Sequence, residues 1–368
     1  MRVLHVIPSV SKHSGGPATA IVPMCRALQK RGVEVALVST NEGVPQINTD
    51  RAVDFKGVLT KFFPVQFGGS FKYSRPLTAW LKKNVKTFDL VHVHAVFNHS
   101  SVAAARACRE SGVPYVVRPL GTLDPWSMTQ KPLRKRIFWT VSAKNMLQRA
   151  AAVHYTTIAE KEATETFLGL NHGRVIALGV DANGSEHAAE PPTGPYVLSL
   201  SRLHPKKALD VLIDAFIAVN RDPWQLVIAG DGPADYVAFL KQKARGSERI
   251  SFTGWVEGEQ KDALFRGASL FALPSRQENF GLGVLEAMAR GVPALVSSKV
   301  DLAADIKAAA AGWVVDLDEL DHALDVALSD EHERAQRGRA AYLFSQQYSW
   351  DKTATDLIRL YQDILSRP

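Results

Sequence analysis

The chain has 368 residues, which is too long for one ordinary hydrophobic core and predicts two domains of roughly 150 to 190 residues each. Its 46% hydrophobic and 22% charged residues are ordinary for a soluble globular enzyme. The two cysteines, Cys25 and Cys108, exclude a disulfide framework and lack metal-ligand spacing, and no apolar stretch is long enough to predict a transmembrane span.

The net charge of +7 is unevenly distributed. Residues 1–185 hold 24 basic and 11 acidic side chains, whereas residues 186–368 hold 20 basic and 26 acidic ones. A basic first half indicates an anionic partner, which includes phosphates, an anionic membrane face and nucleic acid.

The chain opens on a predicted strand at residues 3–7 and not on a signal peptide, because charged and polar turn residues follow at once. We therefore expect a cytoplasmic protein. Short apolar strands then alternate with helical stretches, which is typical of a parallel, doubly wound sheet. Further strands are expected at 34–38, 90–93, 115–117 and 153–155, and helices at 18–30, 77–85, 101–111 and 132–149.

A polar segment rich in Gly, Ala and Pro, residues 181–195, predicts a linker between domains at 1–180 and 196–350. An amphipathic helix at 357–365 is expected within a last segment, 351–368. The second set of strands is expected at 196–200, 224–229, 250–252, 270–273 and 294–296. The fold class predicted is α/β, with two Rossmann-like parallel-sheet domains and ligands at the carboxyl ends of the strands.

The most informative motif spans residues 274–293 and places Glu278 and Glu286 around a loop that opens a helix. Gly281 and Gly283 let the backbone approach a ligand closely, and a helix N-terminus can hold a phosphate. The two glutamates can accept hydrogen bonds from hydroxyls on either side of that phosphate. A diphosphate with a sugar ring at each end satisfies both, so the motif predicts a nucleotide-sugar.

This stretch resembles the Glu-x7-Glu signature of the retaining glycosyltransferases of family 4, enzymes of the GT-B fold, and the resemblance extends from Met1 to about Trp350. It implies two Rossmann-like domains facing across a cleft, with the last helix packed back on the amino-terminal domain. It assigns the ribose hydroxyls to Glu286 and the transferred sugar to Glu278. Backbone contacts to sugar and phosphate are implied for Asn279, Phe280, Gly281 and Leu282.

The resemblance also bears on mechanism. It favours metal-independent front-face attack, in which the donor phosphate takes the proton of the acceptor hydroxyl. A covalent nucleophile at Glu278, as in retaining glycosidases, is left open by the sequence alone.

Arg202 and Lys207 follow the predicted strand at 196–200. They resemble the Arg and Lys with which the family holds the donor's diphosphate, whereas Lys206 fits a solvated basic loop. A bidentate Arg and a point-charge Lys can neutralise the leaving diphosphate without a metal. Ala208 stands where the family usually has Gly, which changes the loop but leaves the charge in place.

Three glycine-bearing loops complete the expected donor site. Gly15 and Gly16 follow the first strand, and the resemblance places them beside the diphosphate and acceptor. Gly230 lies in a loop near the nucleotide, and the loop of Trp255 and Val256 contacts the base, largely through backbone. Uracil and guanine therefore stay as alternatives for the base.

In the first half, His92 and His94 lie on one face of a strand end. A metal pair is one interpretation, but no third ligand is evident, so hydrogen-bonding histidines are favoured, with His94 as the candidate at the site. The loop that carries Arg118, Gly121 and Asp124 resembles the family's cleft-lining, acceptor-side loop.

Asp316 and Asp318 match an Asp-x-Asp metal motif only superficially, because they follow a strand and start a helix; N-capping explains them better. We therefore predict no metal and no cofactor. Basic residues near Phe138 and Trp139 suggest attachment to an anionic membrane surface, against the alternative of a solvated helix over a packed core. These basic residues are Lys131, Arg134, Lys135 and Arg136.

The sequence thus predicts a retaining hexosyltransferase that moves a sugar from a UDP- or GDP-sugar to a glycan hydroxyl, on a lipid-linked or polysaccharide acceptor. Another GT-B enzyme, an epimerase or a pyridoxal-phosphate-binding phosphorylase, is one alternative. A basic nucleic-acid-binding protein is the other, weakened by the acidic second half and by the lack of a recognised binding module.

Overall fold

The computed structural model of the chain describes residues 1–11, 14–67, 69–123, 128, 138–181 and 192–367, and these residues form two units. The first unit comprises Met1–Gly179 together with Trp350–Pro368, and the second comprises Val180–Ser349. The carboxy-terminal helix therefore belongs with the amino-terminal half. Most of the expected linker, residues 182–191, lies outside the described residues.

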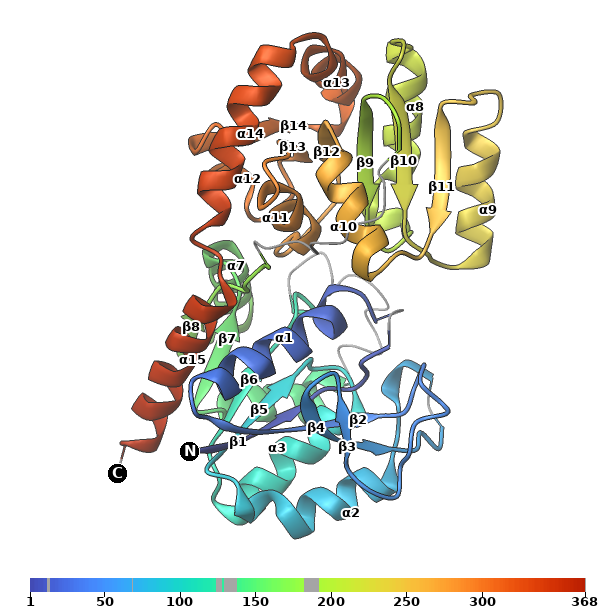
Figure 1. The fold of residues 1–368 in the computed structure, drawn as a ribbon. Coiled ribbons are helices and arrows are strands. Elements are labelled where there is room, and N and C mark those ends of the chain that lie inside the picture. Colours follow the sequence, from blue (N-terminus) through green and yellow to red (C-terminus); the bar gives the residue numbers. More distant parts are fainter. Residues whose placement is uncertain (12–13, 68, 124–127, 129–137, 182–191, 368) are drawn as a thin grey trace. The chain divides into compact units, whose positions relative to one another are not determined.

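Among the described residues, the first unit contains an eight-stranded sheet in the order β3-β4-β2-β1-β5-β6-β7-β8 (Figure 1). All neighbouring strands are parallel except β3, which is antiparallel to β4. Every residue of β5, β6 and β7 is buried, as expected for parallel strands covered on both faces. The strands are β1 (Arg2–Val6), β2 (Glu34–Thr40), β3 (Val53–Phe55), β4 (Val58–Phe63), β5 (Leu90–His94), β6 (Tyr115–Arg118), β7 (Ala152–Tyr155) and β8 (Gly173–Val175).

Helices cover this sheet on both faces. Its described α-helices are α1 (Gly16–Lys30), α2 (Arg75–Asn84), α3 (His99–Ser111), α6 (Lys144–Gln148), α7 (Ile158–Leu168) and α15 (Trp350–Leu365). Helix α1 packs against α15 and helix α2 against α3, on opposite sides of the sheet (Figure 1). Leu357, Leu360, Tyr361 and Ile364 form the buried stripe of α15, and Arg31 Nε donates to Asp351 Oδ1 at 2.8 Å.

The second unit has a fully parallel sheet in the order β11-β10-β9-β12-β13-β14, which is the Rossmann order 3-2-1-4-5-6. Its strands are β9 (Tyr196–Leu200), β10 (Gln225–Ala229), β11 (Ile250–Gly254), β12 (Leu270–Leu273), β13 (Ala294–Ser297) and β14 (Gly312–Val315). In this order the connections reverse direction between β9 and β12, so the loops after these two strands flank the switch point where open α/β sheets bind ligands.

Seven α-helices are described in the second unit. They are α8 (Leu209–Val219), α9 (Ala234–Lys243), α10 (Gly258–Gly267), α11 (Leu282–Met288), α12 (Ala303–Ala308), α13 (Leu320–Ser329) and α14 (Glu331–Ser345). Helix α8 packs against α9 and α13, whereas α11 packs against α10 and α14.

The predicted fold class and all ten predicted strands are confirmed, with ends that match or differ by at most two residues. The prediction missed β3, β4 and β8, whereas the strand expected before Asp316 is β14. It was also wrong about an uninterrupted helix over 132–149: its described part is a π-helical turn (Trp139–Ala143) followed by the short α6. The rest of that stretch, up to residue 137, lies outside the described residues.

Candidate functional site

The centre of the candidate site is an ion pair between Lys207 and Glu278 in the second unit. Lys207 ends a 3-10 turn (Pro205–Lys207) after β9, and Glu278 lies in the loop after β12. The two side chains are 14% and 17% exposed, so both charges are largely removed from water and compensate each other. The structure thus joins two residues predicted from separate motifs, at the switch point of the sheet.

The backbone around Glu278 is held from both neighbouring loops. Arg276 N–H donates to the Lys206 carbonyl at 2.8 Å, which fastens this loop to the one after β9. Glu278 N–H donates to the Lys299 carbonyl at 3.0 Å, and Asp301 N–H donates to the Glu278 carbonyl at 2.9 Å. These bonds fix the position from which the Glu278 side chain projects.

The electrostatics of the site centre on Lys207. Burial, with Lys206 and Arg202 nearby, lowers the pKa of Lys207 to about 7, while the paired Glu278 carboxylate favours its charged form. Arg202 is exposed near the beginning of the same loop, two residues after β9. Ala208, where the family usually has Gly, adopts a left-handed conformation with φ of 52°, which an alanine tolerates only with strain.

The second glutamate of the motif lies on the next helix. Glu286 is on α11, and Lys261 Nζ of α10 lies 2.6 Å from Glu286 Oε1. Gly281 has a φ of 68° and precedes Leu282, the first residue of α11.

Asn279 and Phe280 occupy the loop between the two glutamates. Asn279 Oδ1 accepts from Gln277 Nε2 at 3.0 Å, whereas the buried Nδ2 of Asn279 has no partner among the described residues. Such a donor is suited to a ligand oxygen. Phe280 is buried and contacts the Tyr348 ring, so its side chain anchors the loop.

The loop after β10 requires a glycine at position 230. A Cβ on Gly230 would lie 1.9 Å from the Ser201 carbonyl oxygen, and its φ is 133°. Gly230 thus lets this loop pack on the one that leads to Arg202. Gly230 N–H donates to the Gly254 carbonyl at 2.7 Å, which also ties it to the strand that precedes Trp255.

Trp255 and Val256 connect β11 to α10. Trp255 is half-buried and Val256 is buried. Their predicted contact with the base stays a prediction. In the first unit, Gly15 precedes α1 with a φ of 71° and Gly16 is its exposed first residue, so the glycine loop lies at the start of a helix as predicted.

His94 belongs to a buried histidine cluster. The expectation that no third ligand accompanies His92 and His94 is wrong, because His5 on β1 lies beside them. Ring nitrogens of the three histidines all lie within 4.8 Å of one another. Strand β1 pairs in parallel with β5, which places His5 beside these two residues. The sequence does not show this proximity, because His5 is far from both along the chain. The predicted hydrogen bonding is confirmed: His5 Nδ1 and His94 Nε2 are 3.0 Å apart.

A chain of hydrogen bonds orders these rings. The Ile176 carbonyl lies 2.8 Å from His154 Nε2, so that nitrogen carries the proton. Neutral His154 then accepts at Nδ1 from His92 Nε2 at 3.3 Å, and His92 accepts at Nδ1 from the Tyr361 hydroxyl at 2.7 Å. Burial lowers the pKa of His94 well below its usual value, so the ring is neutral at neutral pH. With no exposed surface, His94 lies inside the core, and its catalytic role stays a prediction.

The expected acceptor-side loop is organised by Glu160, which sequence reasoning missed. Gly121 N–H donates to Glu160 Oε1 at 2.8 Å, and Thr156 N–H donates to Oε2 at 2.8 Å. Arg118 is only 3% exposed and close enough to Glu160 for the carboxylate to raise its pKa against the larger effect of burial. Thr157 caps α7 three residues before Glu160, and this pattern is the sequence feature that could have drawn attention to Glu160.

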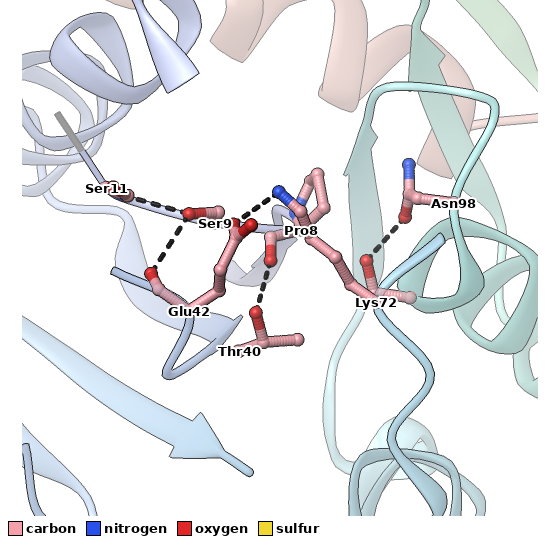
Figure 2. Close-up of polar contacts among 8 residues, drawn as sticks. Pro8, Ser9, Ser11, Thr40, Glu42, Lys72 and Asn98 are labelled. Atoms are coloured by element: carbon pink, nitrogen blue, oxygen red, sulfur yellow. Dashed lines mark hydrogen bonds and ion pairs between the residues drawn. The ribbon is translucent and has the colours of Figure 1, made fainter. Parts of the chain in front are cut away.

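Polar side chains also gather near the carboxyl ends of β1, β2 and β5 (Figure 2). Glu42 is ion-paired with Lys72, whose side chain is 14% exposed. Ser9 Oγ donates to the Glu42 carbonyl at 3.3 Å and accepts from Ser11 N–H at 3.0 Å. Sequence reasoning missed this pair because its members lie 30 residues apart in different loops.

The remaining predictions concern capping and membrane attachment. Asp316 does follow a strand, but its predicted side-chain cap is wrong: its carboxylate accepts from the Ser298 hydroxyl, which follows the adjacent strand β13. Asp124 and the basic residues Lys131, Arg134, Lys135 and Arg136 lie outside the described residues. In the described part of the chain, no helix combines the length and apolarity needed to span a membrane.

Two family models match the chain, one in each half. The model of the glycosyl transferase 4-like domain matches residues 15–180, and that of glycosyl transferases group 1 matches residues 183–344. The second match contains the loops of Arg202, Lys207 and both glutamates.

Two curated relatives with similarity over nearly the whole chain are glycosyltransferases by name. The GDP-mannose:cellobiosyl-diphosphopolyprenol alpha-mannosyltransferase of Komagataeibacter xylinus is 26% identical over 100% of this chain and 94% of its own length. The D-inositol 3-phosphate glycosyltransferase of Jonesia denitrificans is 26% identical over 95% of this chain and 91% of its own length.

Solved structures share the fold. Sucrose-phosphate synthase from Thermosynechococcus elongatus has a TM-score of 0.81 at 18% identity and covers 100% of this chain and 99% of its own. Anabaena HepE in complex with UDP and glucose has a TM-score of 0.78 at 20% identity and covers 99% of this chain and 100% of its own. With both halves matched by glycosyltransferase families, the chain belongs to the family 4 type of glycosyltransferases, which have the GT-B fold and use nucleotide-sugars.

Proposed function

We propose that this protein transfers a hexose from a UDP- or GDP-sugar to a glycan hydroxyl, with retention of anomeric configuration and without a metal or other cofactor. The observation that carries the proposal is the pairing of Lys207 with Glu278 at the switch point of the second unit, with Arg202 on the same loop. A cation and a carboxylate in contact suit a ligand that has an anionic diphosphate next to a hydroxyl-rich sugar.

Each residue has a role in this proposal. Arg202 and Lys207 neutralise the charge that develops on the departing nucleoside diphosphate. Glu286 accepts from the ribose hydroxyls, and Glu278 accepts from hydroxyls of the transferred sugar once the diphosphate has taken its place at Lys207. The acceptor hydroxyl attacks from the face that the diphosphate leaves, and a phosphate oxygen takes its proton.

The acceptor is proposed to be a lipid-linked glycan or a polysaccharide. A relative named for a cellobiosyl-diphosphopolyprenol acceptor supports this class. In the first unit, the polar side chains around Glu42 and Lys72 offer charged and hydroxyl groups to a sugar, and the loop that follows Arg118 and carries Gly121 and Asp124 is proposed to lie on the acceptor side. We further propose a cytoplasmic location with peripheral attachment to the inner membrane face.

A donor panel tests the proposal. Purified protein is incubated with UDP- and GDP-sugars, release of the nucleoside diphosphate is measured, and the anomeric configuration of a transferred sugar is determined by NMR. Release from one donor with a retained anomer is expected. Thermal stabilisation by pyridoxal phosphate or by an oligonucleotide, with no response to UDP or GDP, would instead support a phosphorylase or a nucleic-acid-binding protein.

A further inference from the structure

Lys261 lies beside the carboxylate that the proposed function assigns to the ribose. Its Nζ is 2.6 Å from Glu286 Oε1, and the two side chains are 25% and 21% exposed. Among the described residues, Glu286 Oε2 accepts no hydrogen bond, so Lys261 fixes one carboxylate oxygen and leaves the other available.

The neighbouring residue of the same helix secures the backbone of Glu286. Asp262 is paired with Arg290, with Arg290 Nε 2.6 Å from Asp262 Oδ1. Arg290 in turn donates from Nη1 to the Glu286 carbonyl at 2.8 Å. Asp262 is 5% exposed, so this second pair is well shielded from water. Helix α10 therefore holds the Glu286 side chain directly through Lys261, and its carbonyl indirectly, because Asp262 holds the Arg290 side chain that donates to it.

The buried Phe265 ring gives this arrangement rigidity. Lys261 Nζ lies 5.6 Å from the Phe265 ring centroid, and the guanidinium carbon of Arg290 lies 5.5 Å from it. Phe265 has no exposed surface. Both cations therefore lie near one buried aromatic ring, which favours these positions of Lys261 and Arg290.

Helix α10 also begins directly after the loop of Trp255 and Val256. Lys261 is the fourth residue of this helix, so its ion pair with Glu286 of α11 links the helix that follows the expected base-binding loop to the proposed ribose-binding carboxylate. A residue in this place can couple the position of the base to that of the ribose.

We propose that Lys261 is a positioning residue for nucleotide binding: it holds the Glu286 carboxylate in the orientation in which its free oxygen accepts from the ribose 2′-hydroxyl. The inference rests on the proposed function, because it concerns the same nucleotide. Without Lys261, the half-buried carboxylate rotates toward solvent and its hydrogen bond to the ribose weakens. Hydrogen bonds to charged groups are strong enough that this loss corresponds to about tenfold or more in affinity.

The test compares ribonucleotides with deoxynucleotides. Calorimetry measures binding of UDP, GDP, 2′-deoxy-UDP and 2′-deoxy-GDP to wild type, Lys261→Met, Lys261→Gln and Lys261→Arg. Lys243→Met is the matched control, since Lys243 is 26% exposed and forms an ion pair with Asp214 at 2.7 Å on other helices of the same unit. Circular dichroism checks that each variant is folded, and Lys261→Gln serves if Lys261→Met does not fold.

For the nucleotide that wild type binds, Lys261→Met should weaken the ribonucleotide about tenfold and leave the deoxynucleotide within about twofold. Lys261→Arg should restore most of the affinity, Lys243→Met should match wild type, and KM for the donor should rise more than kcat falls. Equal affinities of Lys261→Met and wild type for the ribonucleotide, or equal losses for ribo- and deoxynucleotide, would overturn the role of Lys261 alone. Binding of neither UDP nor GDP by wild type would overturn the proposed function and this inference together.

Discussion

The Lys207 ammonium and the Glu278 carboxylate are in direct contact, although 71 residues separate them in the sequence. Both are largely buried, so removing either partner leaves an uncompensated charge in a poorly hydrated place. Under the proposed function, the donor diphosphate replaces Glu278 as the partner of Lys207, which frees Glu278 for the sugar. The proposed exchange of partners would couple donor binding to the placement of Glu278.

The first prediction concerns the cations of the site. Replacing Arg202 or Lys207 with Ala should lower the rate of sugar transfer about 10²-fold or more, because the leaving diphosphate loses a donor that contributes roughly 3 kcal/mol. Steady-state transfer assays measure the effect, and circular dichroism checks the fold.

Lys206→Ala is the matched control, because Lys206 is the adjacent cation of the same turn and its expected effect on the rate is small. Wild-type rates in both the Arg202 and the Lys207 variants would contradict the proposed diphosphate site.

The second prediction concerns the pH dependence of nucleotide binding. The pKa of Lys207 is lowered to about 7, so its ammonium is charged below that pH and loses its proton above it. A bound diphosphate requires the charged form, and the nucleotide itself is already ionised above a phosphate pKa of about 6. Affinity should therefore fall between pH 7 and 9, by up to about tenfold per pH unit. Calorimetry of wild type and Lys207→Met measures the nucleotide affinity across this pH range. An equal slope of affinity against pH in both proteins would assign the titration to another group.

Sequence motifs located this site because parallel sheets bring loops that are distant in sequence to one edge. Lys207 and Glu278 were predicted from separate motifs, and the order of β9 and β12 places them together. The ion pair itself could not be predicted, since no sequence signal specifies which side chains meet across two loops. The same limit concealed the pairing of Glu42 with Lys72.

Other omissions had local signals. The hairpin of β3 and β4 is formed by a tight turn in which Gly57 N–H donates to Asp54 Oδ1 at 2.9 Å. The two residues between these strands are Lys56 and Gly57, both with positive φ, and a Gly between short apolar runs indicates such a turn. In contrast, His5 joins the histidine cluster only through strand pairing, which becomes visible once β1 and β5 are known to be neighbours.

The third prediction is metal independence. Among the described residues, the group of side chains spaced for a metal is that of His5, His92 and His94, which lies in the first unit, whereas Arg202 and Lys207 are in the second. Two cations already serve the diphosphate, so transfer should continue in EDTA at close to the untreated rate. Complete loss of activity on chelation, with recovery on adding Mg²⁺ or Mn²⁺, would contradict the prediction. Asp316 and Asp318 would then be candidate metal ligands.

The fourth prediction concerns membrane attachment. Four cations within residues 131–136 adjoin Phe138 and Trp139, and each cation near an anionic leaflet contributes about 1 kcal/mol. We expect binding to vesicles that contain phosphatidylglycerol, weakening as salt increases. Co-sedimentation compares wild type with a variant in which Arg134, Lys135 and Arg136 are Glu. Equal binding by both proteins, or none by wild type at low salt, would favour a soluble acceptor.

The last prediction concerns the stability of the first unit at acidic pH. Burial lowers the pKa of His5 and of His154 to about 3 and those of His92 and His94 well below 6.5. The unfolded chain therefore binds more protons than the folded one between about pH 6.5 and pH 3, and the free energy of unfolding falls as pH decreases through this window. Each histidine contributes up to about 1.4 kcal/mol per pH unit, and the nearby Arg118 guanidinium further disfavours their protonation.

Urea unfolding at pH 7.5, 6.5 and 5.5 measures this dependence. His154→Gln keeps a side-chain donor for the Ile176 carbonyl and removes one titrating ring, so its stability should fall less steeply with pH than that of wild type, by about 1.4 kcal/mol per pH unit. The exposed His322 of the second unit provides the control, since His322→Gln should retain the wild-type slope. Stability that does not change between pH 7.5 and 5.5 would mean that the four histidines do not stay neutral in the folded protein, and the hydrogen-bond chain from Ile176 to Tyr361 would need a different arrangement of protons.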